Sequence, residues 1–251
     1  TPNTGAAGVH HVHSDGLSDI LGIIYGAASG EAEWQTAIAG LRDLFGGSSA
    51  NFVRHGPDIG PEDLIATESD PVFHERFVAE FASEANPFIH RAMQAEAGKV
   101  FTDRTLFDRA ELRASRYWNE WMAPQDMYSG MFCKVWVSDT SIWAFNVQRG
   151  CKQAEFGRDE IAMLEKLLPH LNRAMRISRY RLTAQALTST FYQLPFGILL
   201  VGADQHIIEM NELAETLLSR PDSRLRIEAG RLVPTCANAA EMRAAIAQAR
   251  L

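Results

Sequence analysis

The sequence predicts an α+β protein, with an antiparallel sheet flanked by helices and a long helix that leads to a second, smaller domain. Three observations predict this class. Apolar residues recur at helical spacing in two segments between Leu17 and Phe45. Two β-rich runs, 131–137 and 142–148, are joined by four polar residues, a loop length typical of hairpins. A helical pattern then continues from residue 158 to about residue 190.

The composition is that of an ordinary soluble globular protein, with 46% hydrophobic and 22% charged residues among 251. The formal net charge of −7 disfavours broad contact between this chain and nucleic-acid phosphates. No apolar run approaches the roughly 18–20 residues that span a bilayer, so we expect no membrane partner. Cys133, Cys151 and Cys236 are few and widely spaced, which fits a reducing cytoplasm.

Residues 1–15 lack apolar periodicity and predict a flexible tail. Two amphipathic helices are expected after this tail, and Gly46-Gly47 ends the second of them. Their apolar positions are Leu17, Ile20, Leu21 and Ile24, then Trp34, Ile38, Leu41 and Phe45. Short strands are predicted at 50–55 and 64–67, on either side of a loop that contains glycine and proline.

Asp70-Pro71 introduces a third helix, in which phenylalanine recurs every four residues at Phe73, Phe77 and Phe81. The pattern from 86 to 128 is less regular. Asn86-Pro87 marks a turn, and Asp108 and Glu111 fit the start of a helix that continues through Trp118 and Met122.

The predicted hairpin carries apolar side chains on both faces. In its first strand Phe132, Lys134 and Trp136 share one face, and in its second strand Trp143 and Phe145 share one face. A sheet with two apolar faces is expected to be covered by helices on both sides.

The long helical segment carries an apolar heptad track. Its members are Ile161, Leu164, Leu168, Leu171, Met175 and Leu182, with Ser178 as one polar member. Such a track either pairs with the same helix of a second copy or packs on the protein's own sheet. Pro169 is expected to kink or split the helix, because proline removes a backbone donor.

An apolar run from Leu194 to Val201 is followed by a polar turn and a second apolar run at 207–210. This order predicts strand, hairpin, strand and then a helix that Asn211 caps. It resembles the opening of a PAS sensor domain.

The two N-terminal helices, the antiparallel sheet and the exit helix together resemble a GAF-like sensor domain. The exit-helix stretch Leu167 to Ala174, which reads LLPHLNRA, is similar to that of bacterial LuxR-type helix-turn-helix transcriptional regulators, and so is the motif Leu194-Pro195-Phe196-Gly197. The resemblance implies a GAF-like sensor domain at 16–157, a connecting helix at 158–190 and a PAS-like domain at 191–251.

The PAS-like segment is partial. A domain of that kind takes about 100 residues, and the chain continues for about 57 residues beyond Leu194. We therefore expect a fragment of a longer regulator that lacks its DNA-binding domain, and DNA contact is implied only through that missing C-terminal part. Because LuxR-type regulators read DNA as dimers, the resemblance also implies a homodimer, which we place at the connecting helix.

The motifs of common enzyme classes are absent from the sequence. It has no Gly-x-Ser-x-Gly elbow, no glycine-rich phosphate loop, no His-Glu-x-x-His and no Cys-x-x-Cys. We therefore do not expect an enzyme. The sequence identifies no cofactor; a flavin or haem in the PAS-like part stays open, although that segment is short for enclosing one.

An aromatic cluster is the candidate ligand site, because flat apolar walls with a few polar groups suit a small organic molecule. The predicted site consists of Trp118, Trp121, Phe132, Trp136, Trp143 and Phe145, with Lys134 and Asn146 as polar contacts. The same aromatic residues would also suit a protein core or a dimer surface.

Three functions remain open from the sequence. The first is the signal-sensing and dimerisation region of a cytoplasmic transcriptional regulator that binds a small organic ligand in its GAF-like domain. The second is a ligand-free interaction module, and the third is a small-molecule enzyme on the same kind of fold.

Overall fold

The computed structural model describes residues 7–57, 59–67, 70–82, 86–202, 204–235 and 239–248. The chain divides into two compact units, Thr1–Tyr180 and Arg181–Leu251. The division falls inside helix α7 (Arg158–Gln193), the segment that the sequence predicted to connect two domains.

The first unit is built on a five-stranded antiparallel sheet with the strand order β2-β1-β5-β4-β3. The strands are β1 (Ser49–His55), β2 (Leu64–Ala66), β3 (Val100–Thr102), β4 (Ser129–Val137) and β5 (Ile142–Arg149). The predicted hairpin is the central pair β4–β5. The α+β class with an antiparallel sheet flanked by helices is therefore confirmed.

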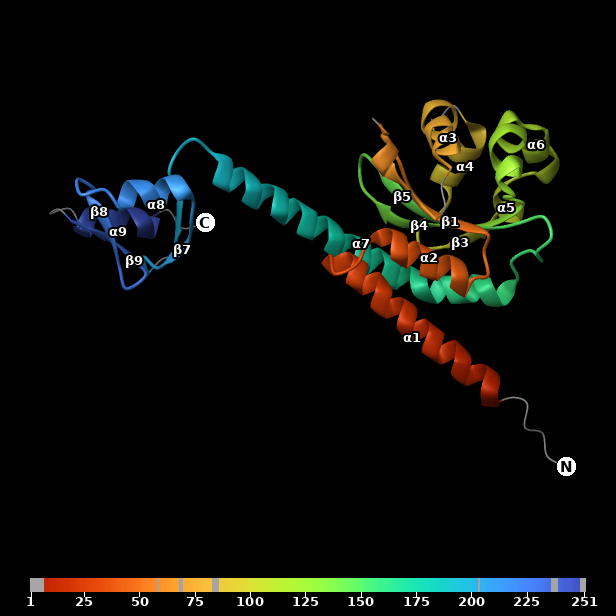
Figure 1. Ribbon diagram of the computed structural model, residues 1–251, viewed down its shortest axis with the longest axis horizontal. Coiled ribbons are helices and arrows are strands. Elements are labelled where there is room, and N and C mark those ends of the chain that lie inside the picture. The colour runs from red at the N-terminus through yellow and green to blue at the C-terminus, as the bar shows by residue number, and fades with distance from the viewer. Residues whose placement is uncertain are drawn as a thin grey trace. The chain divides into compact units, whose positions relative to one another are not determined.

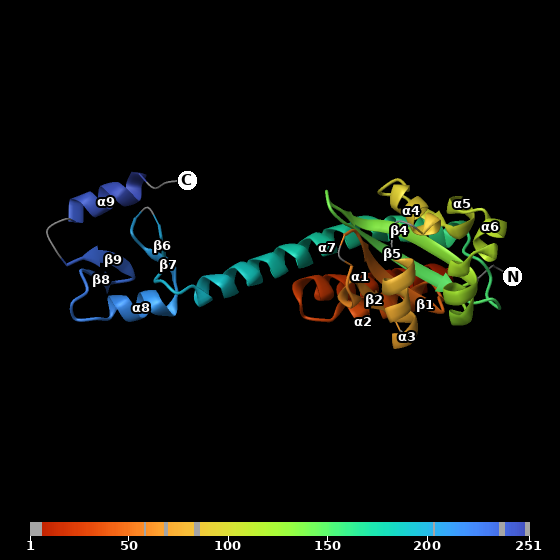
Figure 2. The ribbon, with the colours of Figure 1, turned by 90° about the horizontal axis from the view of Figure 1, so that it is seen from above.

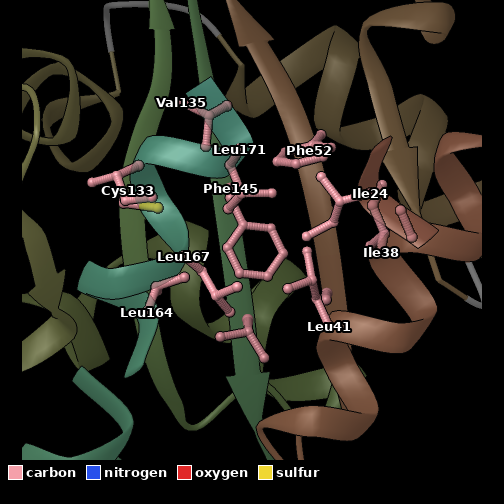
Figure 3. Packing of buried hydrophobic residues seen from close by; sticks show 14 of the residues in the cluster. Ile24, Ile38, Leu41, Phe52, Cys133, Val135, Phe145, Leu164, Leu167 and Leu171 are labelled. Carbon is pink, nitrogen blue, oxygen red and sulfur yellow. The ribbon is translucent and has the colours of Figure 1, made fainter. Parts of the chain in front are cut away.

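One face of the sheet is covered by α1 (Ala7–Ser29), α2 (Trp34–Leu44) and α7 (Figure 1). The larger core of the unit lies between these helices and the sheet. In it, Ile24 and Leu41 pack near Phe145 and Leu164 (Figure 3). Helix α1 begins at Ala7, so residues 7–15 are helical where the sequence predicted a flexible tail; residues 1–6 lie outside the described residues.

A second helical layer lies over the opposite face (Figures 1 and 2). It consists of α3 (Pro71–Arg76), the π-helical turn η2 (Phe77–Phe81), α4 (Pro87–Gln94), α5 (Asp103–Leu106), α6 (Arg109–Ala114) and the π-helical turn η3 (Trp118–Met122). Short 3-10 turns are η1 (Pro61–Asp63) and η4 (Ala123–Gln125). Side-chain oxygens of Asp70, Asn86 and Asp108 accept from backbone N–H groups and cap three of the helices.

Helix α7 uses its predicted heptad track inside its own unit. Leu164, Leu168 and Leu171 are at most 3% exposed and pack on the sheet, so these residues are not available to a second copy. Of the two alternatives for this track, packing on the protein's own sheet therefore holds at these three residues. Pro169 lies inside α7 without splitting it.

The second unit follows the predicted order of strand, hairpin, strand and helix. Its elements are β6 (Leu199–Val201), β7 (Ile207–Met210), α8 (Glu212–Leu218), β8 (Leu225–Glu228), β9 (Arg231–Pro234) and α9 (Ala239–Gln248). Asn211 caps α8 as predicted: its Oδ1 accepts from Ala214 N at 3.0 Å and from Ile198 N at 2.9 Å. Its Nδ2 also donates to the carbonyl of Phe196 at 2.8 Å, so one side chain joins the strand, the turn and the helix.

Candidate ligand-binding pocket

A pocket of about 90 Å³ lies between the sheet and the layer of α3 to η3. Its floor is formed by β1, β4 and β5, and its roof is formed by η2, α4 and the segment that leads into η3. The two layers differ in chemistry, because the roof is aromatic and the floor is largely polar.

The roof is a continuous set of packed rings. Tyr117 stacks on Trp121, with ring centroids 5.3 Å apart and planes inclined by 7°. Phe77 packs against Trp121 at 4.9 Å, and Phe88 lies 6.2 Å from Tyr117. The indole Nε1 of Trp121 donates to the carbonyl of Phe73 at 2.9 Å, which fixes the orientation of the ring. Two of these aromatics come from π-helical turns, a feature that recurs at functional sites.

The floor is polar because alternate residues of β1 and β5 point to the same face. Asn51 and His55 come from β1, and Asn146 and Gln148 come from β5. The amide Nδ2 of Asn146 donates to Asn51 Oδ1 at 2.9 Å across the two strands. Gly130 of β4 makes room for Gln148, since a Cβ at that position would meet Gln148 Oε1 at 2.6 Å.

The titratable groups near the floor are shifted by burial. Burial, together with the charge of Lys134, lowers the pKa of His55 to about 4, so this imidazole is neutral at pH 7. Burial raises the pKa of Asp103, whose Oδ2 lies 3.6 Å from an Arg109 guanidinium nitrogen. Burial also raises the pKa of the Tyr117 hydroxyl. Each shift favours the uncharged form of its group.

The structure divides the predicted site residues between the two faces of the sheet. Trp121, Phe132 and Asn146 line the pocket. Trp118 packs in the same layer without lining the pocket, and Lys134 donates its ammonium to the carbonyl of Met93. The use of these residues as a ligand site stays a prediction.

The other three predicted residues do not line the pocket: Phe145 belongs to the core beneath α7, and Trp136 and Trp143 are partly buried and pack against that core. Phe145 is fully buried there. A β-bulge between Lys134 and Trp136 explains one displacement, because the extra residue turns Trp136 away from the face of Phe132 and Lys134.

The sequence-based prediction missed Asn51, His55, Asp103, Tyr117 and Gln148, all of which line the pocket. One signal was present for two of them. Ser49, Asn51 and His55 are polar residues at positions of equal parity in β1, which places polar groups on one face of a largely buried strand. The positions of Asp103 and Tyr117 depend on how the irregular segment 86–128 folds back over the sheet.

A second pocket, of about 320 Å³, adjoins the first and shares Asn51, Leu64, Trp121 and Met127 with it. Its remaining walls are more polar and include Ser49 and Thr67 from the edge of the sheet. The two pockets therefore form neighbouring apolar and polar compartments over one sheet face.

No protein-family model matches the chain, and no curated protein sequence matches it. Solved structures do. The ligand-binding domain of VqsR from Pseudomonas aeruginosa matches with a TM-score of 0.50 and 14% identity, over 65% of this chain and 96% of that one. CepR2 from Burkholderia cenocepacia, an N-acylhomoserine-lactone-dependent LuxR family transcription factor, matches with a TM-score of 0.51 and 15% identity, over 69% and 99%. A phycoerythrobilin-bound GAF domain of a cyanobacterial phytochrome has a TM-score of 0.41 and 13% identity, over 67% and 98%.

At identities this low the likeness is one of fold. The chain carries the α+β fold found in ligand-binding domains of LuxR-type regulators. Within the described part of the chain, no helix is long and apolar enough to cross a membrane, and no group of three or more His, Cys, Asp or Glu residues is placed to hold a metal ion.

Proposed function

We propose that this chain is the signal-sensing and dimerisation region of a cytoplasmic bacterial transcriptional regulator. It binds a small organic molecule in the pocket between the sheet and the α3–η3 layer, and it passes the bound state to a DNA-binding domain outside this chain. The observation that most directly supports this proposal is the pocket, which has a packed aromatic roof and a polar floor. It lies in a fold that regulator ligand-binding domains share.

The sheet supplies the physical route for the relay. Strand β5 alternates between the two sides, so that Gln148 faces the pocket while the neighbouring Val147 is fully buried beneath the helices of the opposite face. Leu164 and Leu171 of α7 pack in that same core. A ligand that moves the floor of the pocket therefore moves the surface on which α7 rests.

The proposed dimer surface on α7 uses residues outside its buried track. Ile177, Tyr180 and Leu187 are 40%, 67% and 67% exposed. Together with Ala184 and Phe191 they follow the spacing three, four, three, four, which is the repeat of a two-helix coiled coil. The second unit, PAS-like in its order of elements, would then couple the paired helices to the output domain.

A pocket-filling substitution tests the binding proposal. Ala92 lines the pocket from α4 and is 8% exposed, so Ala92→Phe should fill the space without removing a hydrogen bond. Ala79→Phe, at an exposed position of η2, is the matched control. The wild-type chain and the control should gain thermal stability with hits from a small-molecule library and carry them in native mass spectrometry, whereas Ala92→Phe should not.

A ligand-free dimerisation module is the second candidate. It is favoured by the small volume of the pocket, about 90 Å³, and by the mutual packing of the roof aromatics. A wild-type chain that takes up no molecule in the library experiment, and none from bacterial extract, would support this candidate against the first.

A further inference from the structure

The floor of the pocket holds buried polar atoms without partners. Among the described residues, five buried side-chain atoms make no hydrogen bond. Two are the indole nitrogens of Trp136 and Trp143, on the opposite side of the sheet, and the other three are Ser49 Oγ, His55 Nδ1 and Gln148 Oε1. All three belong to the pocket face of the sheet, because Ser49 and Gln148 are direct partners across β1 and β5, and His55 lies six residues along the same strand. Buried polar groups are normally satisfied, so this set points to an absent polar partner.

The chemistry of these atoms limits the partner. The Gln148 side chain offers a carbonyl oxygen that accepts and an amide nitrogen that donates, and the neutral His55 ring offers one nitrogen of each kind. The ligand therefore needs a group that donates a hydrogen bond to the floor. An amide or a hydroxyl group on the ligand is complementary to the primary amide of Gln148. A purely apolar guest would leave the Gln148 oxygen unsatisfied.

The charge of the pocket limits the partner further. Asp103 lines the pocket, and neither lysine nor arginine is among its described lining residues. Lys134 is engaged by the carbonyl of Met93, and Arg109 is engaged by Asp103 and Glu155. An anionic ligand would lose its hydration and would find no lysine or arginine among the described lining residues to compensate its charge. The pocket therefore favours an uncharged molecule.

The size and the roof limit the shape. A cavity of about 150 Å³ is enough to hold benzene in a protein core, and this pocket measures about 90 Å³ with the larger polar pocket beside it. The first pocket alone is smaller than the benzene cavity, so one ring with a short substituent fits only where it also extends into the adjoining pocket. The faces of Tyr117, Trp121 and Phe77 supply the aromatic surface against which such a ring packs.

We propose that the pocket recognises an uncharged single-ring aromatic molecule whose amide or hydroxyl group donates to Gln148 on the polar floor. The inference rests on the proposed ligand-sensing function and specifies its ligand class. Gln148 is the residue that selects the donor, and the aromatic roof selects the ring.

Four probes of similar size test the proposal on the full chain: benzamide, acetophenone, benzoate and toluene. Acetophenone keeps the carbonyl of benzamide and lacks its N–H donors, benzoate adds a charge, and toluene lacks polar groups. By titration calorimetry, benzamide should bind about tenfold more tightly than each of the others, the factor that one well-placed hydrogen bond provides. Equal or tighter binding of acetophenone, benzoate or toluene would overturn the donor requirement, the charge argument or the polar-floor argument respectively.

A variant pair assigns the effect to the floor. Gln148→Met keeps the length of the side chain and removes its amide, so it should bring benzamide to the affinity of toluene. Gln185→Met, at an exposed position of α7, should leave the preference unchanged. An undiminished preference in Gln148→Met overturns the assignment, and the probe comparison on the wild-type chain decides the ligand class even if that variant does not fold. Binding of none of the four probes refutes the single-ring class, whereas the sensing function fails only if the library and extract experiments also yield no ligand.

Discussion

The burial of His55 makes the stability of this protein dependent on pH. His55 is 3% exposed, and burial, aided by the charge of Lys134, lowers its pKa from 6.5 to about 4. In the unfolded chain the imidazole returns to its ordinary pKa. Between pH 6.5 and pH 4 the unfolded state therefore binds a proton that the folded state does not, and acidification through this range favours unfolding.

The size of the effect follows from the two pKa values. At about 1.4 kcal/mol for each pKa unit, a fall from 6.5 to about 4 corresponds to roughly 3 kcal/mol of folding free energy, present above pH 6.5 and lost as the pH approaches 4. Hydrogen bonds to Arg116 lower the pKa of Glu120 to about 2. Its contribution to folding free energy is therefore lost only at pH values below the ordinary pKa of a carboxyl group. Asp103, whose pKa is raised by burial, acts in the opposite direction at that acidic end.

Urea unfolding at several pH values between 7 and 4.5 measures this dependence. The wild-type chain should lose most of the 3 kcal/mol across that interval, whereas His55→Gln, which has no titrating ring, should show a much flatter profile. His90→Gln removes an exposed histidine of α4 and should keep the wild-type profile. A His55→Gln profile as steep as the wild-type profile would refute the argument that this buried ring drives the acid sensitivity.

Three further predictions concern the core, the dimer surface and the second unit. Phe145→Ala should destabilise the first unit by about 3–5 kcal/mol in denaturant unfolding, because the ring is fully buried beneath α7, and a cost below about 1 kcal/mol would contradict that placement. Leu187→Glu should shift the chain towards monomer in sedimentation and leave the melting temperature unchanged. Leu164→Glu, at a buried position, should instead unfold the first unit. A dimer that persists in Leu187→Glu argues against the exposed track as the dimer surface. Asn211→Ala should speed hydrogen exchange at the amides of Ile198 and Ala214, because it removes the hydrogen bonds that these amides donate to the Asn211 side chain. Unchanged protection of both amides would disprove the role of this cap.

The parts of the fold that local chemistry decides could be predicted from the sequence. The β4–β5 hairpin, the helix starts at Asp70 and Asp108 and the cap at Asn211 depend on residues within a few positions of one another. Their hydrogen bonds close over short loops, so spacing and residue type are sufficient to place them.

The parts that depend on long-range packing could not be predicted in this way. The apolar heptad track of α7 has the same sequence pattern whether it packs on a second helix or on a sheet. In the structure, Leu164 and Leu171 pack on the sheet. The bulge after Lys134 places Trp136 on the opposite side of the sheet from the one that strict alternation predicts. No glycine or other turn residue in the sequence marks the position of this bulge. The pocket floor brings together Asn51 and Gln148, which lie far apart in the sequence on strands β1 and β5.

The buried core and the proposed ligand site lie on opposite faces of the same strands. Along β5, Phe145 and Val147 are fully buried in the core beneath α7, while Asn146 and Gln148 turn to the pocket. Substitutions at the first pair should therefore change the free energy of unfolding, and substitutions at the second pair should change ligand preference at smaller cost. Gln148 Oε1 has no hydrogen bond to lose within the described chain, so we expect Gln148→Met to cost little folding free energy. The proposed ligand would supply the hydrogen bond that Gln148 Oε1 lacks, and the probe series on the wild-type chain and on Gln148→Met tests this.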